Sequence, residues 1–342
     1  MSAVPRVSTQ VPVKEDFIAH AEPYRSELTA HCYRMLGSVH DAEDLVQETY
    51  LRGWQGYEKF EERAALRTWL YRIATHACLR VLEGRSRRVM PAGLGDASAD
   101  PATPLDTGAN GHSWMEPLPD RSSPEEMVVA RNSVRLAIAT ALQELPASQR
   151  AVLILRDVAQ FSAAEVAALL STTPAAVNSA MQRARAHLNL VAPAEDAVSL
   201  PADERRRAML DRYCGAFERG DVVALTELLR ADVALEMPPL TTWFVGRDAV
   251  TGFLAARALG GPGEVTMLAI RANGQAAAAA YRLGADGMQH AHALHVLTED
   301  ATGEIATVSV FLDVGLFDAF GLPVTRSPAD ALRSTPSITR MS

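Results

Sequence analysis

Lysine is nearly absent from this chain of 342 residues, and cysteine is scarce. Lys14 and Lys59 are the only lysines, so almost every basic residue is an arginine, which together with the many alanines indicates GC-rich coding. Cys32, Cys78 and Cys214 lie far apart in no ligand-like spacing, which argues against a disulfide framework and against a zinc site. The sequence therefore predicts neither a bound metal nor a cofactor.

Long apolar runs are missing as well. Nowhere do eighteen apolar residues follow one another, so no membrane span is expected. The N-terminus, MSAVPRVSTQVPVKEDF, lacks the charged-then-apolar layout of a signal peptide. A hydrophobic share of 48% and a mean hydropathy of −0.01 are typical of a globular chain. These features predict a cytoplasmic protein, and its length predicts two or three domains.

Positive charge is concentrated in one short stretch of an acidic chain. The net charge of −8 argues against a protein that coats nucleic acid along its whole surface. Between Arg63 and Arg88, however, seven arginines accompany a single acid, Glu83, which gives a local balance of +6. Acids that would alternate with arginines on an ordinary solvated helix are almost missing there. The pattern indicates a localised contact with a polyanion.

Changes in composition divide the chain into four parts. Residues 15–88 show helical periodicity with little Gly or Pro. Residues 89–124 are rich in Pro and Gly, which predicts a flexible linker. Helical periodicity returns over 125–190, and 205–325 combine an opening helix with strand-like runs such as ATVSVFLDVGLF. We expect two all-α domains followed by an α+β domain with a curved antiparallel sheet.

The sharpest motif is FSAAEVAALLSTTPAAVNSAMQRARAHL. Ser162 and Glu165 have the spacing of a capping box, and Thr173 followed by Pro174 is typical of the start of a second helix. One face of that second helix is apolar, at Val177, Met181, Ala184 and Leu188. The opposite face carries Asn178, Ser179, Gln182 and Arg183. These side chains suit base edges and phosphates, which predicts a DNA-reading helix-turn-helix; an ordinary αα-hairpin is the alternative.

Charge also lines two helices of the first domain. In HDAEDLVQETYLRGW we expect Asp41 to be the N-cap of a helix with acidic residues along one side, usually a solvated face. In LRTWLYRIATHACLRVLEGRSRR, basic side chains four residues apart line an outward stripe that runs into an arginine cluster. Trp69 and Tyr71 beside this stripe are candidates for stacking on unpaired bases, although Trp69 is more typical of a core.

These stretches carry a resemblance to a known family. EPYRSELTAHCYRMLGSVHDAEDLVQETYLRGW and LRTWLYRIATHACL resemble region 2 of a sigma-70 family factor of the extracytoplasmic-function (ECF) branch. The helix-turn-helix after LPASQRAVLILRDV resembles region 4 of the same family. The third domain resembles a SnoaL-like domain, and the whole chain is similar to the SigG-type group, which appends such a domain. The resemblance implies a non-catalytic subunit that binds core RNA polymerase and directs promoter-specific initiation.

The resemblance also assigns roles to individual residues. The surface that docks on the β′ clamp coiled coil matches Asp41, Asp44, Gln47 and Glu48. The −10 element contacts match Arg72, His76 and Arg80. The −35 element contacts match Thr173, Asn178, Ser179, Gln182 and Arg183. The usual partner of region 4 is the polymerase β-flap, and an anti-sigma factor or a small ligand is a further candidate partner.

Two departures from the family pattern matter. Asn178 and Ala180 stand where the family commonly has basic residues, so the grip on −35 phosphates should be weaker. His76 replaces a common Asn, so the −10 preference should differ from that of other members. Two DNA-facing elements on a tether, each weak alone, suit a subunit that works when polymerase holds both. A repressor would need a tighter grip on duplex DNA.

The C-terminal domain is acidic, with a balance of −4 over 205–320, so DNA binding there is not expected. The SnoaL-like resemblance implies a cone-shaped fold with an apolar cavity, and the candidate lining residues are Asp232, Glu236, Trp243, Tyr281, His292 and Asp313. His290 and His292 alternate onto one strand face and His295 onto the other, which disfavours a three-histidine metal site. Catalysis, a ligand or regulatory contact, and a purely structural role all stay open.

Two other classes of protein remain as alternatives. A stand-alone DNA-binding regulator with a ligand-sensing pocket would bind a specific sequence without polymerase. A SnoaL-like enzyme that uses the other domains for localisation would show turnover that is lost on changing Asp232 or Asp313.

Overall fold

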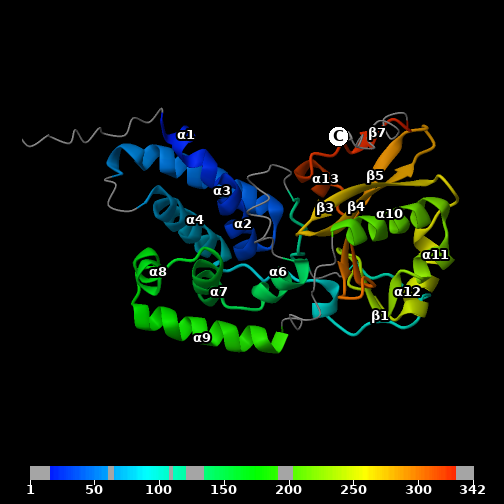
Figure 1. Ribbon diagram of the computed structural model, residues 1–342, viewed down its shortest axis with the longest axis horizontal. Coiled ribbons are helices and arrows are strands. Elements are labelled where there is room, and N and C mark those ends of the chain that lie inside the picture. Colours follow the sequence, from blue (N-terminus) through cyan, green and yellow to red (C-terminus); the bar gives the residue numbers. More distant parts are fainter. Residues whose placement is uncertain (1–15, 61–64, 108–110, 121–134, 192–202, 329–342) are drawn as a thin grey trace, which may run out of the picture. The chain divides into compact units, whose positions relative to one another are not determined.

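The computed structural model describes residues 16–60, 65–107, 111–120, 135–191 and 203–328. The chain divides into two compact units (Figure 1). Unit 1 takes residues up to 36, then 40–85 and 145–190. Unit 2 takes residues 37–39, 86–144 and those from 191 onward.

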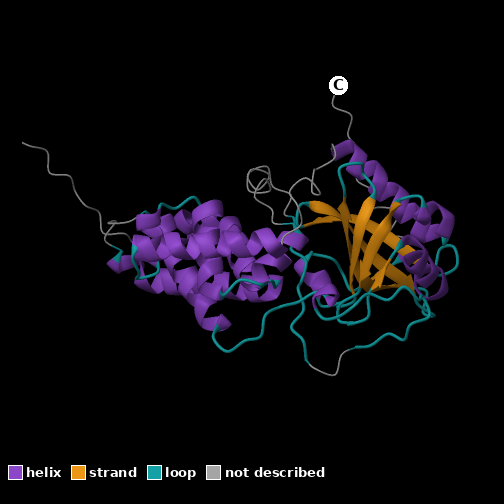
Figure 2. Cartoon of the chain, turned by 90° about the horizontal axis from the view of Figure 1, so that it is seen from below, coloured by secondary structure: helices purple, strands orange, loops and turns teal. Residues whose placement is uncertain are grey.

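The described part of unit 1 is helical (Figure 2). Its α-helices are α1 (Phe17–Ala21), α2 (Arg25–Leu36), α3 (Val39–Gly56), α4 (Leu66–Leu82), α7 (Ala147–Leu153), α8 (Ala163–Leu169) and α9 (Pro174–Val191), with 3₁₀ turns at Glu22–Tyr24 and Tyr57–Lys59 and a π-helical turn at Ile154–Val158. Leu28 and Cys32 of α2 and Leu70 of α4 are fully buried, so the apolar faces predicted from the periodicity form the core. The helical prediction for residues 15–88 and 125–190 is confirmed over the described helices, whereas residues 61–64 and 125–134 lie outside the described part of the chain.

Helix α3 begins two residues before Asp41, so the prediction of Asp41 as its N-cap is wrong. The first amide of the helix, Val39 N–H, donates to Oε2 of Glu116 at 3.0 Å, and the Ser38 hydroxyl donates to the same oxygen at 2.8 Å. A carboxylate at this place satisfies amides that have no partner inside the helix, and its charge suits the helix dipole. Because Glu116 lies 77 residues away from Val39 in the sequence, no local pattern could reveal this cap.

Unit 2 is an α+β body around one curved sheet (Figure 2). Its elements are the 3₁₀ turn Pro91–Gly93, α6 (Leu136–Gln143), α10 (Asp203–Arg219), α11 (Val222–Thr226), β1 (Leu229–Glu236), β2 (Phe244–Val245), α12 (Arg247–Phe253), the π-helical turn Leu254–Ala258, β3 (Val265–Ala272), β4 (Gln275–Leu283), β5 (Gln289–Glu299), β6 (Ile305–Phe311), α13 (Leu316–Ala319) and β7 (Thr325–Arg326). The strand order is β2-β1-β6-β5-β4-β3, and β7 pairs with β5. Every pairing is antiparallel except that of β1 with β6, which is parallel. The predicted antiparallel sheet is therefore correct apart from this one pair, whose strands are joined by a long connection instead of a hairpin.

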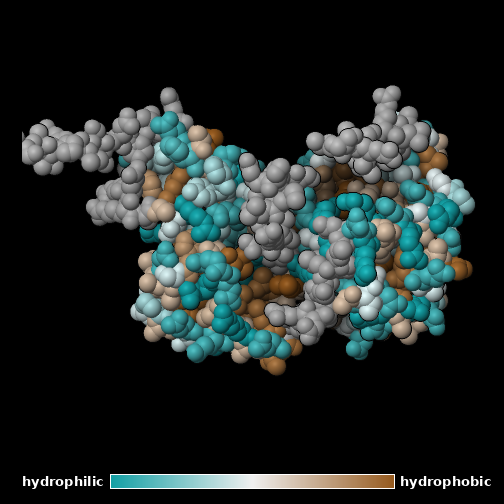
Figure 3. Space-filling model, viewed as in Figure 1, coloured by the Kyte–Doolittle hydropathy of each residue, from teal (hydrophilic) through white to brown (hydrophobic). Residues whose placement is uncertain are grey.

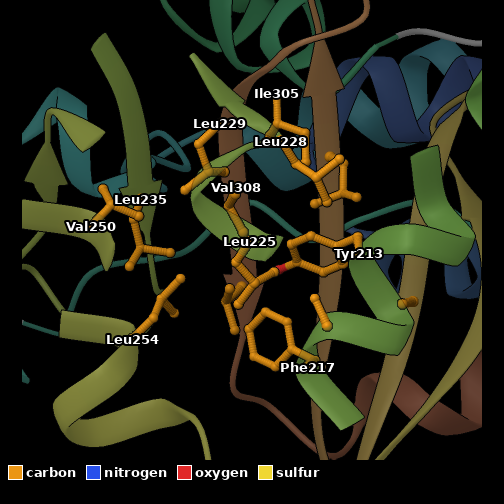
Figure 4. Close-up of a cluster of buried hydrophobic side chains, with 14 of the residues drawn as sticks. Tyr213, Phe217, Leu225, Leu228, Leu229, Leu235, Val250, Leu254, Ile305 and Val308 are labelled. Carbon is orange, nitrogen blue, oxygen red and sulfur yellow. The ribbon is translucent and has the colours of Figure 1, made fainter. Parts of the chain in front are cut away.

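The hydrophobic core of unit 2 lies between α10 and one face of the sheet. Tyr213 and Phe217 project from α10 toward side chains of the strands, with Leu225 of α11 beside them (Figure 4). Leu235 of β1 and Val308 of β6 are register partners and lie on the same face. Burial of this continuous apolar layer accounts for the α+β architecture predicted from the alternating runs.

The stretch predicted as a linker contacts the rest of unit 2 along much of its length. Trp243 Nε1 donates to the carbonyl of Gly95 at 2.9 Å. The Arg257 guanidinium donates to the carbonyls of Ala102 and Thr103, at 2.8 and 2.9 Å. The sequence predicts a flexible connection here, whereas the described residues, 89–107 and 111–120, are hydrogen-bonded in place. Side chains of the C-terminal domain supply the partners that a Pro- and Gly-rich segment cannot find within a helix or strand of its own.

Candidate nucleic-acid interface

Helices α8 and α9 of unit 1 form the predicted helix-turn-helix. The Glu165 amide donates to Ser162 Oγ at 3.2 Å, and the Ser162 amide donates to the Glu165 carboxylate at 2.7 Å, so the capping box is confirmed. Thr173 Oγ1 accepts from the amide of Ala176 at 3.2 Å, and α9 begins at Pro174. Both helix starts therefore follow the local sequence pattern.

Helix α9 has one buried and one exposed face. Val177, Met181 and Ala184 are buried, as the apolar stripe predicts, whereas Leu188 is half-buried. On the opposite face four candidate DNA contacts are all exposed: Asn178, Ser179, Gln182 and Arg183. This face presents an amide, a hydroxyl, a second amide and a guanidinium in succession, which are groups that hydrogen-bond to base edges and phosphates.

The predicted basic stripe on α4 is only partly open to solvent. Arg72 and Arg80 are exposed. His76 is half-buried, and its Nε2 lies 2.9 Å from the carbonyl oxygen of Leu169 at the end of α8. Since a carbonyl only accepts hydrogen bonds, Nε2 carries the hydrogen that is donated to it. Two of the three stripe residues thus face solvent, and the third is bound by the helix-turn-helix.

Arg67 of α4 contacts the segment that leads into the helix-turn-helix. Its Nε donates to both carboxylate oxygens of Glu27 at 3.0 Å, and its two terminal nitrogens donate to the carbonyl of Ala159 at 3.2 and 3.3 Å. The guanidinium carbon lies 4.8 Å from the ring centre of Tyr71 and 4.9 Å from that of Phe161. Burial lowers the pKa of Arg67, but the hydrogen bond to Glu27 and the nearby charges raise it by more, so this side chain stays charged.

The aromatic residues beside the stripe are not available as predicted. Tyr71 is buried and packs edge-on against Phe161, with ring centres 5.1 Å apart, so the prediction that it is exposed for stacking on bases is wrong. Trp69 is half-buried next to Phe60 at 5.1 Å, closer to the core role that its type favours. The sequence missed Phe161, which follows the π-helical turn, because its partner is 90 residues away.

On the acidic face of α3, two of the four candidate residues are exposed and the other two form ion pairs. Asp44 and Gln47 are exposed, whereas Asp41 and Glu48 each contact an arginine. The two ion pairs are Asp41 with Arg85, at 3.2 Å, and Glu48 with Arg52. Ion pairs this exposed contribute little to stability, so a partner with a complementary surface could replace them at small cost.

The arginine cluster that follows α4 is neutralised by acids from distant parts of the sequence. Arg85 contacts Asp41 in unit 1, and the other two arginines contact acids within unit 2. Those two pairs are Arg87 with Glu144 and Arg88 with Glu116, the latter at 3.2 Å. The exposed basic stripe expected from local composition is therefore shorter than predicted, because composition cannot show acids that only the fold brings near.

The six residues proposed for a pocket in the C-terminal domain bond to different segments and not to one another. Asp232 is exposed, and its hydrogen bond with Arg230 lowers its pKa. Glu236 is buried, which raises its pKa, and accepts from the amide of Ala92 at 2.9 Å. Trp243 donates to the Gly95 carbonyl, and Tyr281 donates to the Pro323 carbonyl at 3.0 Å. His292 is half-buried. Asp313 is exposed and accepts from the Gly315 amide at 2.8 Å. No shared site emerges from their contacts.

A buried tyrosine and histidine in unit 2 were not among those candidates. The Tyr213 hydroxyl and Nδ1 of His295 lie 2.8 Å apart inside the core, beside Phe217. Burial lowers the pKa of His295 to about 3, so its imidazole is neutral. Strand alternation predicts His295 on the opposite face from His290, and this prediction is wrong. A β-bulge at His292 shifts the register of β5, so His290 pairs with Arg282 and His295 with Ala278, which lie on the same face of β4. Within the described ranges, no group of three His, Cys, Asp or Glu residues is placed to hold a metal ion.

Three families match the chain in succession. Residues 21–88 match sigma-70 region 2, residues 135–188 match sigma-70 region 4, and residues 210–311 match a SnoaL-like domain. The chain is 49% identical over 314 residues to the ECF RNA polymerase sigma factor SigG of Mycobacterium tuberculosis H37Rv, covering 90% of this chain and 84% of that protein. It belongs to the ECF family of RNA polymerase sigma factors. The resemblance and the fold class predicted from the sequence are thereby confirmed.

Another relative spans nearly the whole of this sigma factor. The ECF sigma factor SigJ of M. tuberculosis is 27% identical over 333 residues, or 94% of this chain and 97% of that one. The crystal structure of SigJ, at 23% identity, covers 90% of this chain and 99% of its own with a TM-score of 0.57, so the two share a fold. As a sigma factor, the protein binds core RNA polymerase and directs promoter-specific transcription initiation.

The surface of this sigma factor is mostly hydrophilic in the view of Figure 3, with apolar side chains scattered among polar ones. None of the described helices is long and apolar enough to cross a membrane. Region 4 itself is divided between the two units. Its first helix, α6, belongs to unit 2, whereas α7, α8 and α9 belong to unit 1. Only residues 144–146 separate α6 from α7 along the chain.

Proposed function

We propose that this sigma factor reads the −35 element with the exposed face of α9. The observation that carries the proposal is the division of that helix into a buried stripe and a face with Asn178, Ser179, Gln182 and Arg183 in solvent. Thr173 holds the helix N-terminus, where backbone amides suit a phosphate. Because Asn178 and Ala180 are uncharged, this face makes few phosphate contacts and depends on polymerase for affinity.

The −10 element is assigned to α4, with Arg72, His76 and Arg80 as its contacts. Arg72 and Arg80 are exposed, but His76 is bound to the Leu169 carbonyl within unit 1. The two promoter elements are centred about 25 base pairs apart, or about 85 Å at 3.4 Å per base pair. A molecule in which His76 is 2.9 Å from the helix-turn-helix cannot reach both. The packed form of unit 1 is therefore a state that must open before both elements are engaged.

Core polymerase is the partner assigned to the acidic face of α3. Asp44 and Gln47 are exposed, and the ion pairs of Asp41 and Glu48 lie near the surface, so the whole face can be offered to the β′ clamp coiled coil. Region 4 is the partner for the β-flap, and an anti-sigma factor would compete for the same surfaces. A subunit of polymerase acts where polymerase is, which places this protein in the cytoplasm.

The C-terminal domain is assigned a modulating role without catalysis. Its hydrogen bonds to the stretch between regions 2 and 4, through Trp243 and Arg257, let it control how far that stretch can extend. An enzyme is the second candidate, and the buried Tyr213–His295 pair is the observation that favours it. Their burial and the dispersal of the six earlier candidates weigh against turnover.

Run-off transcription with purified core polymerase tests the −35 assignment. Templates with and without an intact −35 element are transcribed with the wild-type chain, with Asn178→Ala/Gln182→Ala, and with Arg185→Ala as a control. Arg185 is exposed on α9 but pairs with Asp157 at 2.8 Å, so it is occupied by a protein partner. We expect the double variant to lose discrimination between the templates and the control to keep it. A double variant that still discriminates would contradict the assignment.

The modulating role is tested in the same assay with a chain that ends near residue 200. We expect its transcript yield to differ from that of the full chain at equal core binding, because the linker loses its partners on the C-terminal domain. Equal yields under all conditions would show that the domain does not act on initiation.

A further inference from the structure

The tip of the β3–β4 hairpin holds two segments that lie far from it in the sequence. Asn273 and Gly274 form the two-residue turn, with φ of 54° and 69°, the conformation that an Asn-Gly hairpin favours. Asn273 is completely buried. Its side-chain oxygen accepts from the amide of Leu118 at 2.9 Å, and its own amide donates to the Leu118 carbonyl at 2.8 Å. The side-chain oxygen and the backbone amide of Asn273 thus bind the two backbone polar groups of Leu118.

The next residue of the tip binds the linker again. The Gly274 amide donates to both carboxylate oxygens of Asp120, at 2.9 and 3.1 Å. Arg271 lies 3.4 Å from the same carboxylate, whose side chain is only 12% exposed. The linker is therefore fixed at residues 118 and 120 by polar contacts from three residues of the tip: Arg271, Asn273 and Gly274.

Gln275, the first residue of β4, holds the other segment. Its Oε1 accepts from the amide of Leu136, the first residue of α6, at 2.8 Å. Its Nε2 donates to the carbonyl of Leu297 at 3.1 Å and to the hydroxyl of Thr298 at 2.8 Å. The Gln275 side chain is 5% exposed, and all three of these bonds fix its orientation. A helix N-terminus that has no cap of its own is capped here by the C-terminal domain.

The charges around this contact oppose one another. Arg135, the N-cap of α6, is attracted by Glu299 at the end of β5, but burial and the stronger repulsion by Arg206 lower its pKa. Arg206 of α10 approaches the same carboxylate to 4.0 Å, and both of these side chains are buried. The start of region 4 is thus held to the C-terminal domain by the hydrogen bond of Gln275 and not by charge.

We propose that Gln275 is a positioning residue for −35 recognition: with Asn273 and Gly274 it clamps residues 118, 120 and 136 at one corner of the C-terminal domain. This inference rests on the proposed reading of the −35 element by α9. The clamp fixes the linker at residues 118 and 120 and the start of region 4 at residue 136. Three residues join α6 to α7, so the clamped helix leads directly into the helices that precede the helix-turn-helix. The clamp therefore sets which spacing between the −35 and −10 elements the holoenzyme accepts.

The test measures spacing preference in run-off transcription by the holoenzyme. Templates carry the optimal spacer or a spacer one base pair longer or shorter. One base pair changes the distance between the two elements by about 3.4 Å and their relative rotation about the DNA axis by about 34°. Gln275→Met keeps the length of the side chain but removes its hydrogen bonds. The matched control is Gln289→Met, another buried glutamine of the same sheet, which bonds to Thr266 and Arg326 and touches neither α6 nor the linker.

We expect the ratio of transcripts from the optimal and altered spacers to fall about 2- to 10-fold for Gln275→Met, the shift that loss of one hydrogen bond produces. Gln289→Met should keep the wild-type ratio. Thr298→Val, which removes one anchor of the Gln275 side chain, should lower the ratio in the same direction and provides a second variant if Gln275→Met folds poorly. A general loss of stability would lower all transcripts together and leave the ratio unchanged.

Two results would overturn the proposal. One is a Gln275→Met or Thr298→Val protein that transcribes with the wild-type spacing preference. The other is a wild-type protein that shows no spacing preference although it depends on the −35 element. If the wild-type chain does not depend on the −35 element at all, the assignment of α9 fails first, and the two failures are distinguishable.

Discussion

Replacement of Arg67 by methionine should open the packed form of unit 1. Methionine keeps an unbranched apolar chain that can lie against Tyr71 and Phe161, as the stem of arginine does. It loses the guanidinium that donates to the Ala159 carbonyl and stacks on both rings. The helices of region 4 would keep the bond of His76 to the Leu169 carbonyl, the apolar contact around Phe161 and the bond of Arg150 in α7 to the Met35 carbonyl of α2.

The expected size follows from the contacts that are lost. A hydrogen bond from a charged donor contributes about 1.5–3 kcal/mol, and a cation over an aromatic ring about 0.5–1 kcal/mol at an exposed site. Arg67 is 32% exposed, so water replaces part of both interactions. We therefore expect the packed form to lose about 2 kcal/mol of stability relative to the open form, which raises the ratio of open to closed molecules about thirty-fold. The Glu27 side chain is 25% exposed, so water can replace its lost partner, and leaving this carboxylate unpaired adds little to the loss of stability.

Single-molecule energy transfer in the free protein measures this ratio. Dyes are attached to cysteines introduced as Ala19→Cys in α1 and Ala186→Cys in α9, both exposed positions of unit 1. The native cysteines are buried and stay unlabelled. Arg25→Met is the matched control, because Arg25 also pairs with an acid, Glu22 at 2.8 Å, and also stacks on a tyrosine, Tyr50 at 4.5 Å, but contacts no residue of region 4 in the structure.

The open population should grow for Arg67→Met and stay at the wild-type level for Arg25→Met. Addition of core polymerase should shift all three proteins to the open form. If Arg67→Met leaves the distribution unchanged, or if both variants change it equally, the contact at Ala159 does not hold the packed form together.

Three further predictions concern the helix-turn-helix and the acid response. In holoenzyme binding assays, Arg183→Ala should reduce the slope of log promoter affinity against log salt concentration by about one unit, the effect of one lost phosphate contact. Arg185→Ala should change the slope less, because the charge of Arg185 is paired with Asp157. Equal slopes for the two variants would show that Arg183 does not contact a phosphate. Ser162→Ala should lower the free energy of unfolding in urea by about 1 kcal/mol, because the capping bond to Glu165 is lost, with Ser179→Ala as a neutral control. His31 and His295 have their pKa lowered by burial to about 3, so the unfolded chain binds more protons below pH 6.5, and stability should fall by about 1.4 kcal/mol per pH unit for each histidine as the pH drops from 6.5 toward 3. His295→Gln should reduce that slope in urea unfolding at pH 7 and pH 5, and an unreduced slope would place the acid sensitivity elsewhere.

Local sequence patterns predicted the parts of the structure that depend on neighbours in the chain. The capping box at Ser162, the start of α9 at Pro174 and its buried stripe follow from residues three or four positions apart. The Asn273–Gly274 turn obeys the same kind of rule. Family resemblance then supplied the roles of the exposed residues, which periodicity alone left open between a DNA-reading helix and an ordinary polar surface.

Contacts between distant residues could not be predicted in this way. The cap on α3 comes from Glu116, the arginines after α4 find acids elsewhere, and His76 meets a carbonyl of α8. Composition marked the Pro- and Gly-rich stretch as flexible, because it cannot show that Trp243 and Arg257 supply hydrogen bonds to it. The buried pair of Tyr213 and His295 was missed for the same reason, since each residue alone is typical of a core.

The docking of the linker on the C-terminal domain limits how this architecture can be passed between proteins. A sigma factor that gained only the C-terminal domain would leave Trp243 and Arg257 without the carbonyls of Gly95, Ala102 and Thr103. The exchangeable piece begins near residue 86, where the chain enters unit 2, instead of at the start of the last domain. Chimaeras joined at that point should retain regulation, and the linker and the domain should change together as relatives diverge.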